Sequence, residues 1–374
     1  MPSTSAVDRL FSIPQAYAYT PENERLFLEA MAEMVEHHRR NSPVYDGVCR
    51  QDDFSWDQVR HPDDVYRVPH IFVTAFKLRR LLSVPESEIV VTFTSSGTSG
   101  QKSQTNWDAG SRDRQAFSRK AVVESMGLAD YEQPVNYLVL SYDPASGGTR
   151  GAAHAFAMYT TFAPAAETVF AITRGPDGQP RFQPRLCLEA LERFAASSLP
   201  LRVVGFPAFG YMLLKELEAR GLRLRFPPQS LMMLGGGWKQ HTGRAIPPDQ
   251  YRALVERVLG IPCQRVRDFY GMVEHGIPYL SCEYGHHHVP IYSRVCAVDP
   301  GTLEILPEGR VGLLKLITPY NRATPAISVL STDLGQLRSG CPCGRPGRYL
   351  VFARRGGVKK HAGCAISAAQ LIGQ

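Results

Sequence analysis

Residues 94–103 concentrate small and hydroxyl-bearing side chains around one lysine. Their sequence is TSSGTSGQKS, in which glycines allow close approach of the backbone and Lys102 adds a positive charge. Backbone N–H groups, hydroxyls and a cation together suit the oxygen atoms of a polyphosphate. The stretch is not a Walker motif, because no glycine directly precedes Lys102. A flexible polar loop is the alternative interpretation of the same residues.

Further motifs follow in the chain: the glycine run Gly235–Gly237, the segment DFYGMVE at 268–274 and the segment STDL at 331–334. Together with the 94–103 stretch, they resemble in order the motifs of the adenylate-forming (ANL) superfamily, which includes acyl-CoA synthetases. Val273 stands where that family usually has threonine, Thr332 stands where it has glycine, and no proline precedes Lys102. The superfamily hinge motif is only faintly matched, from Ala353 to Gly363.

The resemblance implies a site for ATP and Mg²⁺. The loop would hold the β- and γ-phosphates, Glu274 would coordinate Mg²⁺ through its carboxylate, and Asp333 would accept hydrogen bonds from the ribose. Lys102, Lys239, Lys359 and Lys360 remain open as the cation that assists at the α-phosphorus. The implied nucleotide-binding residues are Thr94, Ser95, Ser96, Gly97, Thr98, Ser99, Gly100, Gly235, Gly236, Gly237, Tyr270, Gly271, Asp333 and Arg354.

The chain ends in KKHAGCAISAAQLIGQ, which carries Cys364. A cysteine shortly after the hinge-like segment resembles the layout of the acyl-protein synthetase (LuxE) family, near the phenylacetate-CoA ligase branch. Members activate a fatty acid as acyl-AMP and pass the acyl group through a cysteine near the C-terminus. The resemblance implies Cys364, Glu274 and Lys102 as catalytic residues. The alternative is that Cys364 is a small packed residue of a terminal strand.

Cysteines and histidines in two further segments form a candidate zinc site. Cys341 and Cys343 flank one proline, and Cys282 begins the segment CEYGHHHVP. Thiolate and imidazole groups at such spacings suit tetrahedral Zn²⁺. We expect Cys282, His287, Cys341 and Cys343 to be the ligands, although the sequence leaves the choice among the three histidines open. The alternative is a turn with incidental thiols beside a surface histidine tract.

Strands and helices alternate through the middle of the chain. Apolar runs predict strands at 88–93, 137–143, 201–207 and 230–237, and helical spacing predicts helices at 22–40, 187–197, 208–221 and 249–260. This alternation predicts an α/β fold with a largely parallel or mixed sheet. The resemblance makes it an ANL-type N-terminal domain of mixed sheets covered by helices, with a small β-rich subdomain and a truncated C-terminal domain.

We expect four regions. They are a helical N-terminal segment at 1–85, an α/β nucleotide- and acyl-binding region at 86–288, a β-rich subdomain at 289–350 and a C-terminal segment at 351–374. The acyl group would meet apolar walls from Phe206, Pro207, Phe209, Met212 and residues 154–159, although these are more often plain core.

Composition narrows the class of protein. The 374 residues carry a net charge of +7 without a dense basic stripe, which favours anionic ligands such as nucleotides over nucleic acid. No apolar run has the length of a membrane span, the N-terminus does not resemble a secretion signal, and eight scattered cysteines indicate reduced thiols in the cytoplasm.

The expected function is therefore ATP-dependent activation of a fatty or aromatic acid, with transfer through Cys364 to a partner protein or thiol. The acceptor would be a reductase, a carrier protein or coenzyme A. Three alternatives remain open: direct transfer to coenzyme A or a carrier protein, a non-catalytic nucleotide-binding protein, and a cysteine acyltransferase that does not use ATP.

Overall fold

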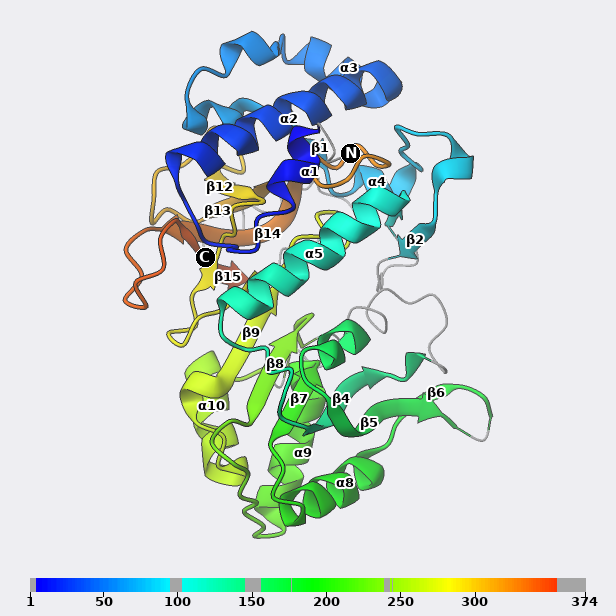
Figure 1. Cartoon of the computed structure of the whole chain (residues 1–374), viewed down its shortest axis with the longest axis vertical. Helices are drawn as coiled ribbons and strands as arrows, with labels where there is room; N and C mark the ends of the chain where they lie inside the picture. The colour runs from blue at the N-terminus through cyan, green and yellow to red at the C-terminus, as the bar shows by residue number, and fades with distance from the viewer. Residues whose placement is uncertain are drawn as a thin grey trace. The chain divides into compact units, whose positions relative to one another are not determined.

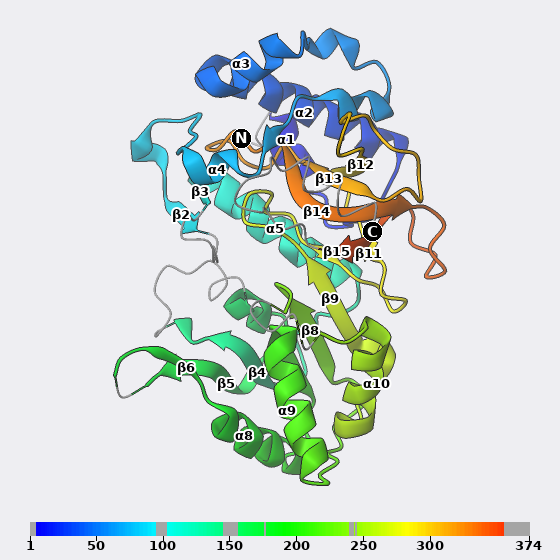
Figure 2. The same cartoon turned by 180° about the vertical axis from the view of Figure 1, so that it is seen from behind.

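The computed structural model describes residues 5–94, 103–144, 156–175, 177–238, 243 and 245–354. The chain divides into two compact units (Figures 1 and 2). Unit 1 comprises Met1–Ser125, Met272–Tyr279 and His286–Gln374, and unit 2 comprises Met126–Gly271 and Leu280–Gly285. Each unit is built around its own sheet.

A seven-stranded mixed sheet forms the centre of unit 2, in the order β10-β9-β8-β7-β4-β5-β6. The strands are β4 (Val135–Tyr142), β5 (Ala165–Arg174), β6 (Pro180–Phe182), β7 (Leu201–Gly205), β8 (Leu231–Gly235), β9 (Val266–Tyr270) and β10 (Tyr279–Leu280). Strands β5, β4, β7, β8 and β9 run parallel, and β6 pairs antiparallel at one edge. Strands β7 and β8 are buried along their whole length, and β8 accordingly has a continuous apolar sequence, whereas β7 includes the buried Arg202.

Helices α8 (Pro184–Ala196), α9 (Pro207–Ala219) and α10 (Pro248–Leu259) cover one face of this sheet (Figure 2). Each begins with proline, whose fixed φ suits the first helical turn and whose missing N–H is not needed there. Their apolar stripes share one core with the strands, in which Leu191, Leu217 and Val258 pack with Leu138 and Met232. This core holds the carboxyl ends of β8 and β9 in place.

The sheet of unit 1 has six strands, in the order β11-β15-β14-β13-β12 with β1 paired to β14. The strands are β1 (Ile71–Phe72), β11 (His287–His288), β12 (Arg294–Val298), β13 (Gly312–Ile317), β14 (Ser328–Arg338) and β15 (Tyr349–Arg354). Neighbours are antiparallel except β1, which runs parallel to β14. This region is β-rich, as the short strands and turns after residue 289 predict.

Helices and one hairpin complete unit 1. They are α1 (Ala6–Leu10), α2 (Pro21–Asn41), α3 (Pro43–Gln51), α4 (Ala75–Leu78), α5 (Ala109–Ser125), β2 (Val91–Thr94) and β3 (Gln104–Trp107). Thr20 caps α2 by accepting a hydrogen bond from the Asn23 N–H at 3.2 Å. Arg294 of β12 ties α2 to the sheet, because its guanidinium donates to Glu24 at 2.7 Å and lies over the Phe27 ring.

Short 3₁₀ turns connect several of these elements, at Trp56–Gln58, Pro62–Arg67, Glu86–Glu88, Met158–Thr161 and Cys263–Arg265. They explain one boundary error of the sequence analysis: the strand predicted from residue 88 begins only at Val91, because Glu86–Glu88 form such a turn. Likewise, the strand predicted to end at residue 207 ends at Gly205, because Pro207 already begins α9. The predicted mixed α/β class is confirmed.

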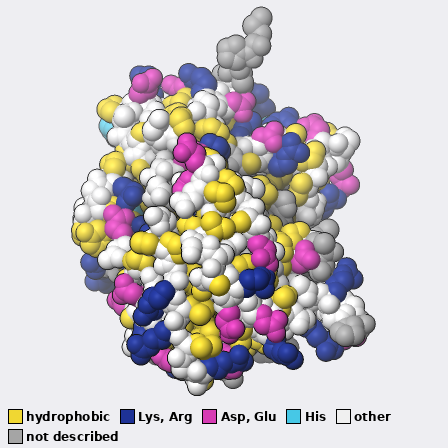
Figure 3. Space-filling model, turned by 60° about the horizontal axis from the view of Figure 1, so that its bottom comes forward, with side chains coloured by type: hydrophobic (Ala, Val, Ile, Leu, Met, Phe, Trp, Pro, Cys, Tyr) yellow, Lys and Arg dark blue, Asp and Glu magenta, His cyan; other side chains and the backbone are white. Residues whose placement is uncertain are grey.

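In the described ranges, no helix combines the length and the apolar character that crossing a membrane would need. On the face shown in Figure 3, Lys and Arg side chains are interspersed with Asp and Glu.

Candidate functional site

The polar stretch at 94–103 links the two strands of a hairpin. Strands β2 and β3 pair antiparallel, with Thr94 opposite Gln104, so both ends of the stretch lie together. Ser95, Ser96, Gly97, Thr98, Ser99, Gly100 and Lys102 lie outside the described residues. Ser103, which directly follows them, is fully buried. The hairpin thus fixes both ends of the predicted phosphate loop.

Strand β3 is anchored within unit 1 by side-chain hydrogen bonds. Thr324 Oγ1 accepts from the Asn106 N–H and donates to the Asn106 carbonyl, both at 3.0 Å. The Trp107 indole N–H donates to Tyr320 Oη at 3.0 Å. A strand anchored in this way gives firm support to a loop whose backbone is expected to present several N–H groups at once.

Glu274 is the buried carboxylate of this region, with only 4% of its surface exposed. Burial raises its pKa, and the nearby Asp333 carboxylate acts in the same direction, whereas a hydrogen bond with Ser103 and the charge of Lys77 lower it. The structure therefore brings Glu274, Ser103, Asp333 and Lys77 within electrostatic reach of one another in unit 1. A buried carboxylate whose ionised form is disfavoured is suited to bind a cation, because the cation offsets its negative charge.

Asp333 lies on β14, where its backbone N–H donates to Ser331 Oγ at 3.1 Å. Its neighbour Leu334 is paired with Arg354 of β15, and the register shifts at this point. Such an irregularity redirects side chains at the end of a ladder. The predicted nucleotide-binding positions 333 and 354 thus lie on adjacent strands, although the Arg354 side chain is outside the described part.

In unit 2, the glycine run follows the carboxyl end of β8. Gly235 is paired with Phe269 of β9, and a Cβ atom on Gly235 would lie 2.4 Å from the Phe269 ring. Gly236 and Gly237 have φ values of 72° and 69°, which favour glycine. Ligands of open α/β sheets bind at this edge, beyond the carboxyl ends of parallel strands. Tyr270 ends β9 at the same edge and is buried.

An aromatic cluster adjoins the glycine run in unit 2. The Phe269 ring stacks on Tyr159 at 5.0 Å between centroids and lies 5.6 Å from Phe156. Phe156 in turn contacts Phe206 at 4.9 Å, and Phe206 contacts Phe209 at 6.1 Å. The structure therefore brings together the aromatic residues that the sequence proposed as acyl-pocket walls. Phe269 was missed as a member, because only the β8–β9 register places it there.

Several predicted residues lie outside the described part of the chain. Besides the loop residues, these are Lys239, Lys359, Lys360 and Cys364.

The predicted cysteine and histidine segments do come together. The ligand atoms of Cys282, His288, Cys341 and Cys343 all lie within 4.8 Å of one another. The histidine in this group is His288, whereas the sequence analysis favoured His287. The two are consecutive residues of β11, and consecutive side chains of a strand point to opposite faces.

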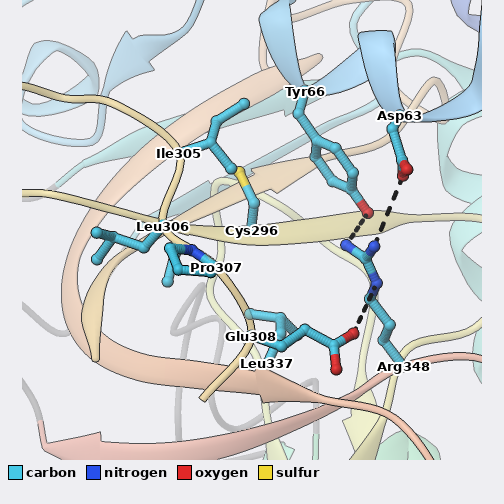
Figure 4. Close-up of a pocket in the computed structure, with 10 residues that line it drawn as sticks. Asp63, Tyr66, Cys296, Ile305, Leu306, Pro307, Glu308, Leu337 and Arg348 are labelled. Atoms are coloured by element: carbon cyan, nitrogen blue, oxygen red, sulfur yellow. Dashed lines mark hydrogen bonds and ion pairs between the residues drawn. The ribbon is translucent and has the colours of Figure 1, made fainter. Parts of the chain in front are cut away.

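A cavity of about 240 Å³ in unit 1 was not anticipated (Figure 4). Its one cation, Arg348, is placed among Tyr66, Asp63 and Glu308, with the Glu308 carboxylate at 3.3 Å. The two carboxylates more than balance the charge of the guanidinium. None of the predicted site residues lines this cavity.

Comparisons with known proteins agree with the motif order. The family model "Acyl-protein synthetase, LuxE" matches residues 2–372. The long-chain-fatty-acid–luciferin-component ligase of Vibrio harveyi is 24% identical over 98% of this chain and 94% of its own length. The ligase of the same name from Aliivibrio fischeri is also 24% identical, over 99% and 95%.

Solved structures show the same fold. An open conformation of 2-hydroxyisobutyryl-CoA ligase superposes with a TM-score of 0.64 at 15% identity, covering 94% of this chain and 72% of that one. The same ligase in its thioesterification state gives a TM-score of 0.63 at 16% identity, over 95% and 72%. The fold is thus that of the adenylate-forming ligases, and the chain is an acid-activating ligase that belongs to the acyl-protein synthetase, LuxE, family.

Proposed function

We propose that this enzyme uses ATP and Mg²⁺ to convert a fatty or aromatic acid into an acyl-AMP, and that Cys364 then takes up the acyl group. The observation that carries the proposal is the buried Glu274 carboxylate, set against Ser103 at the base of the polar loop and close to Asp333. The names of the relatives favour a long-chain fatty acid over an aromatic one.

Activation is needed because a carboxylate is a poor electrophile with a poor leaving group. Its oxygen attacks the α-phosphorus of ATP, a C–O–P link forms, and pyrophosphate leaves. Glu274 would supply a carboxylate ligand to Mg²⁺, which offsets charge on the phosphate oxygens. Asp333 would orient the nucleotide through the ribose, and the loop that ends at Ser103 would hold the phosphates.

Transfer through Cys364 keeps the acyl group reactive. The thiolate attacks the acyl carbon, a C–S bond forms, the C–O bond to AMP breaks, and AMP leaves with the electron pair. The thioester can then pass the acyl group to a partner, such as a reductase or a carrier protein. We also propose a cytoplasmic setting, which fits the free cysteines of the described part of the chain.

Direct transfer to coenzyme A is the second candidate. It is favoured by the fold, because the structural neighbours are CoA ligases, one of them solved with 2-HIB-AMP and CoA. In that case Cys364 would be dispensable.

Acid-dependent ATP–pyrophosphate exchange across a panel of fatty and aromatic acids tests the first step. Mass spectrometry of the intact protein tests the second. We expect exchange with at least one acid and an acyl mass on the peptide that carries Cys364. Cys364→Ser should keep exchange and lose the acyl mass, whereas the control Cys263→Ser, at a half-exposed thiol, should keep both.

Exchange without any acyl mass, with turnover on coenzyme A intact in Cys364→Ser, would favour the second candidate. No exchange with any acid, although ATP binds, would contradict both.

A further inference from the structure

Two short turns present the cysteines of the Cys/His group in the same way. In the first, the Gly285 N–H donates to the Cys282 carbonyl at 2.9 Å, and in the second the Gly344 N–H donates to the Cys341 carbonyl at 3.0 Å. Both glycines have positive φ, 79° and 77°, a conformation that other residues rarely adopt. Two copies of one turn, each opening with a cysteine, indicate a shared structural purpose.

Histidines of the β11 segment face the second turn within unit 1. His288 Nε2 lies 3.2 Å from Cys343 Sγ, and His286 Nδ1 lies 3.1 Å from Cys341 Sγ. His286 also stacks on Tyr349 of β15, with 4.3 Å between ring centroids. The sulfur atoms are thus approached by imidazole nitrogens rather than by apolar side chains.

The donor set fits one metal ion in particular. Three thiols and one imidazole, all within 4.8 Å of one another, are close to the separations of about 3.3 to 3.8 Å that tetrahedral zinc bonds of about 2.0 to 2.3 Å impose. Cys282 and His288 are fully buried and Cys341 nearly so. Soft sulfur donors select zinc over magnesium, and four protein ligands leave no position for water.

We propose that Cys282, His288, Cys341 and Cys343 bind one structural Zn²⁺, with His288 Nε2 as the imidazole ligand. His286, beside Cys341, supports a ligand without being one. The ion would fasten the turn between β14 and β15 to the β11 segment, next to the backbone pairing of His288 with Tyr349. It therefore stabilises the sheet strand from which the chain leads to Cys364, and takes no part in the acyl chemistry.

The test measures metal content and unfolding of the full chain, expressed with zinc in the medium and purified without chelator. We expect about one zinc per chain by elemental analysis. His288→Asn and Cys343→Ser should each bind zinc at least about tenfold more weakly, with a lower unfolding temperature. Cobalt substituted for zinc should give the visible absorption of a tetrahedral thiolate site, and this band should be lost in both variants.

Matched controls separate ligation from general damage. His287→Asn changes the neighbouring histidine of the same strand, and Cys263→Ser changes a thiol outside the group. Both should keep one zinc per chain. Cys343 is only partly buried, so Cys343→Ser is expected to fold even if His288→Asn does not, and circular dichroism checks this.

Zinc at full stoichiometry in Cys343→Ser would overturn the proposal. So would a metal-free wild-type protein, a disulfide between two of the three cysteines, or equal loss of zinc in His287→Asn. These readouts do not depend on acid activation, so failure of one proposal leaves the other standing.

Discussion

At the scale of single residues, Glu274 is a buried carboxylate that lowers the stability of the free protein and that we propose as a Mg²⁺ ligand. Burial and the Asp333 charge disfavour its ionised form, so the ionised carboxylate destabilises the free protein. Its folded-state pKa is raised, so this cost is present above that pKa and relieved as pH falls through it. This cost fits the proposal that Glu274 binds Mg²⁺ during the reaction, because a cation would offset the buried negative charge.

The variant Glu274→Gln should therefore lower acid-dependent pyrophosphate exchange by about 100-fold, because a Mg²⁺ ligand is lost. Its unfolding temperature, measured by calorimetry without ATP, should be equal to or above that of the wild type. Glu189→Gln, at an exposed position of α8, should change neither property. Full activity in Glu274→Gln would remove this residue from the site.

As pH falls, the rate of pyrophosphate exchange should also decline. The decline should begin at a higher pH than with an exposed glutamate at this position, because the raised pKa lets Glu274 take up its proton at higher pH. Exchange rates measured from pH 8 downwards at saturating Mg²⁺ and at limiting Mg²⁺ check this. Higher Mg²⁺ should move the decline to lower pH, since metal and proton compete for the same oxygen atoms. A decline that ignores Mg²⁺ would point to another group.

The buried His38 makes the free energy of unfolding depend on pH. It is fully buried between Ser83 and Asn321, with ring nitrogens 2.8 Å from Ser83 Oγ and 3.0 Å from the Asn321 carbonyl, and burial lowers its pKa to about 3. The folded protein thus keeps it neutral, while the unfolded chain takes up a proton below about 6.5. The stability it confers is present above about pH 6.5 and is lost as pH falls toward 3.

We expect this single group to contribute about 1.4 kcal/mol per pH unit to the decline in unfolding free energy below pH 6.5. Urea unfolding at pH 7, 6 and 5 measures the slope. His38→Gln should lower stability at pH 7 and flatten the slope. An unchanged slope in His38→Gln would show that other groups dominate.

At the scale of elements, the end of β8 depends on the absence of a side chain. The β8–β9 register brings the Phe269 ring against Gly235, and the ring also contacts Tyr159 and Phe156. A ring packed in this way has little room to move. The glycine therefore sets the position of the aromatic cluster.

Gly235→Ala should cost about 1–3 kcal/mol in unfolding free energy through overpacking. It should also raise the KM for ATP or for the acid, because the displaced ring lies at the carboxyl edge of the sheet. Gly243→Ala is the matched control, since a Cβ there meets nothing within 4 Å. Equal effects of the two substitutions would contradict the packing argument.

At the scale of the whole molecule, each unit has its own sheet, and the core of unit 2 carries much of that unit's stability. Leu138 lies in this core with 1% of its surface exposed, whereas Leu78 of α4 is 68% exposed. Leu138→Ala should lower the free energy of unfolding by about 2–5 kcal/mol. Leu78→Ala should change it by no more than about 0.5 kcal/mol. Urea unfolding of both variants checks this, and comparable losses would contradict the assignment of the core.

The sequence by itself determined the local elements and the class of fold. Helical spacing at 22–40, 187–197 and 249–260 and the apolar strands between them are set by each segment's own pattern of burial, and all of them were found with shifts of a few residues. Motif order likewise predicted the family, because the glycines, hydroxyls and carboxylates expected to contact a nucleotide lie in short contiguous stretches.

The tertiary structure decided what depends on register and on contacts between distant segments. Nothing local distinguishes His288 from His287, and only the pairing of β11 with β15 turns His288 toward Cys343. Phe269 joins the aromatic cluster through the β8–β9 register, and Glu274 acquires its raised pKa from burial that no neighbouring residue predicts. A one-residue shift along a strand reverses the direction of a side chain, so such choices are made by the sheet as a whole.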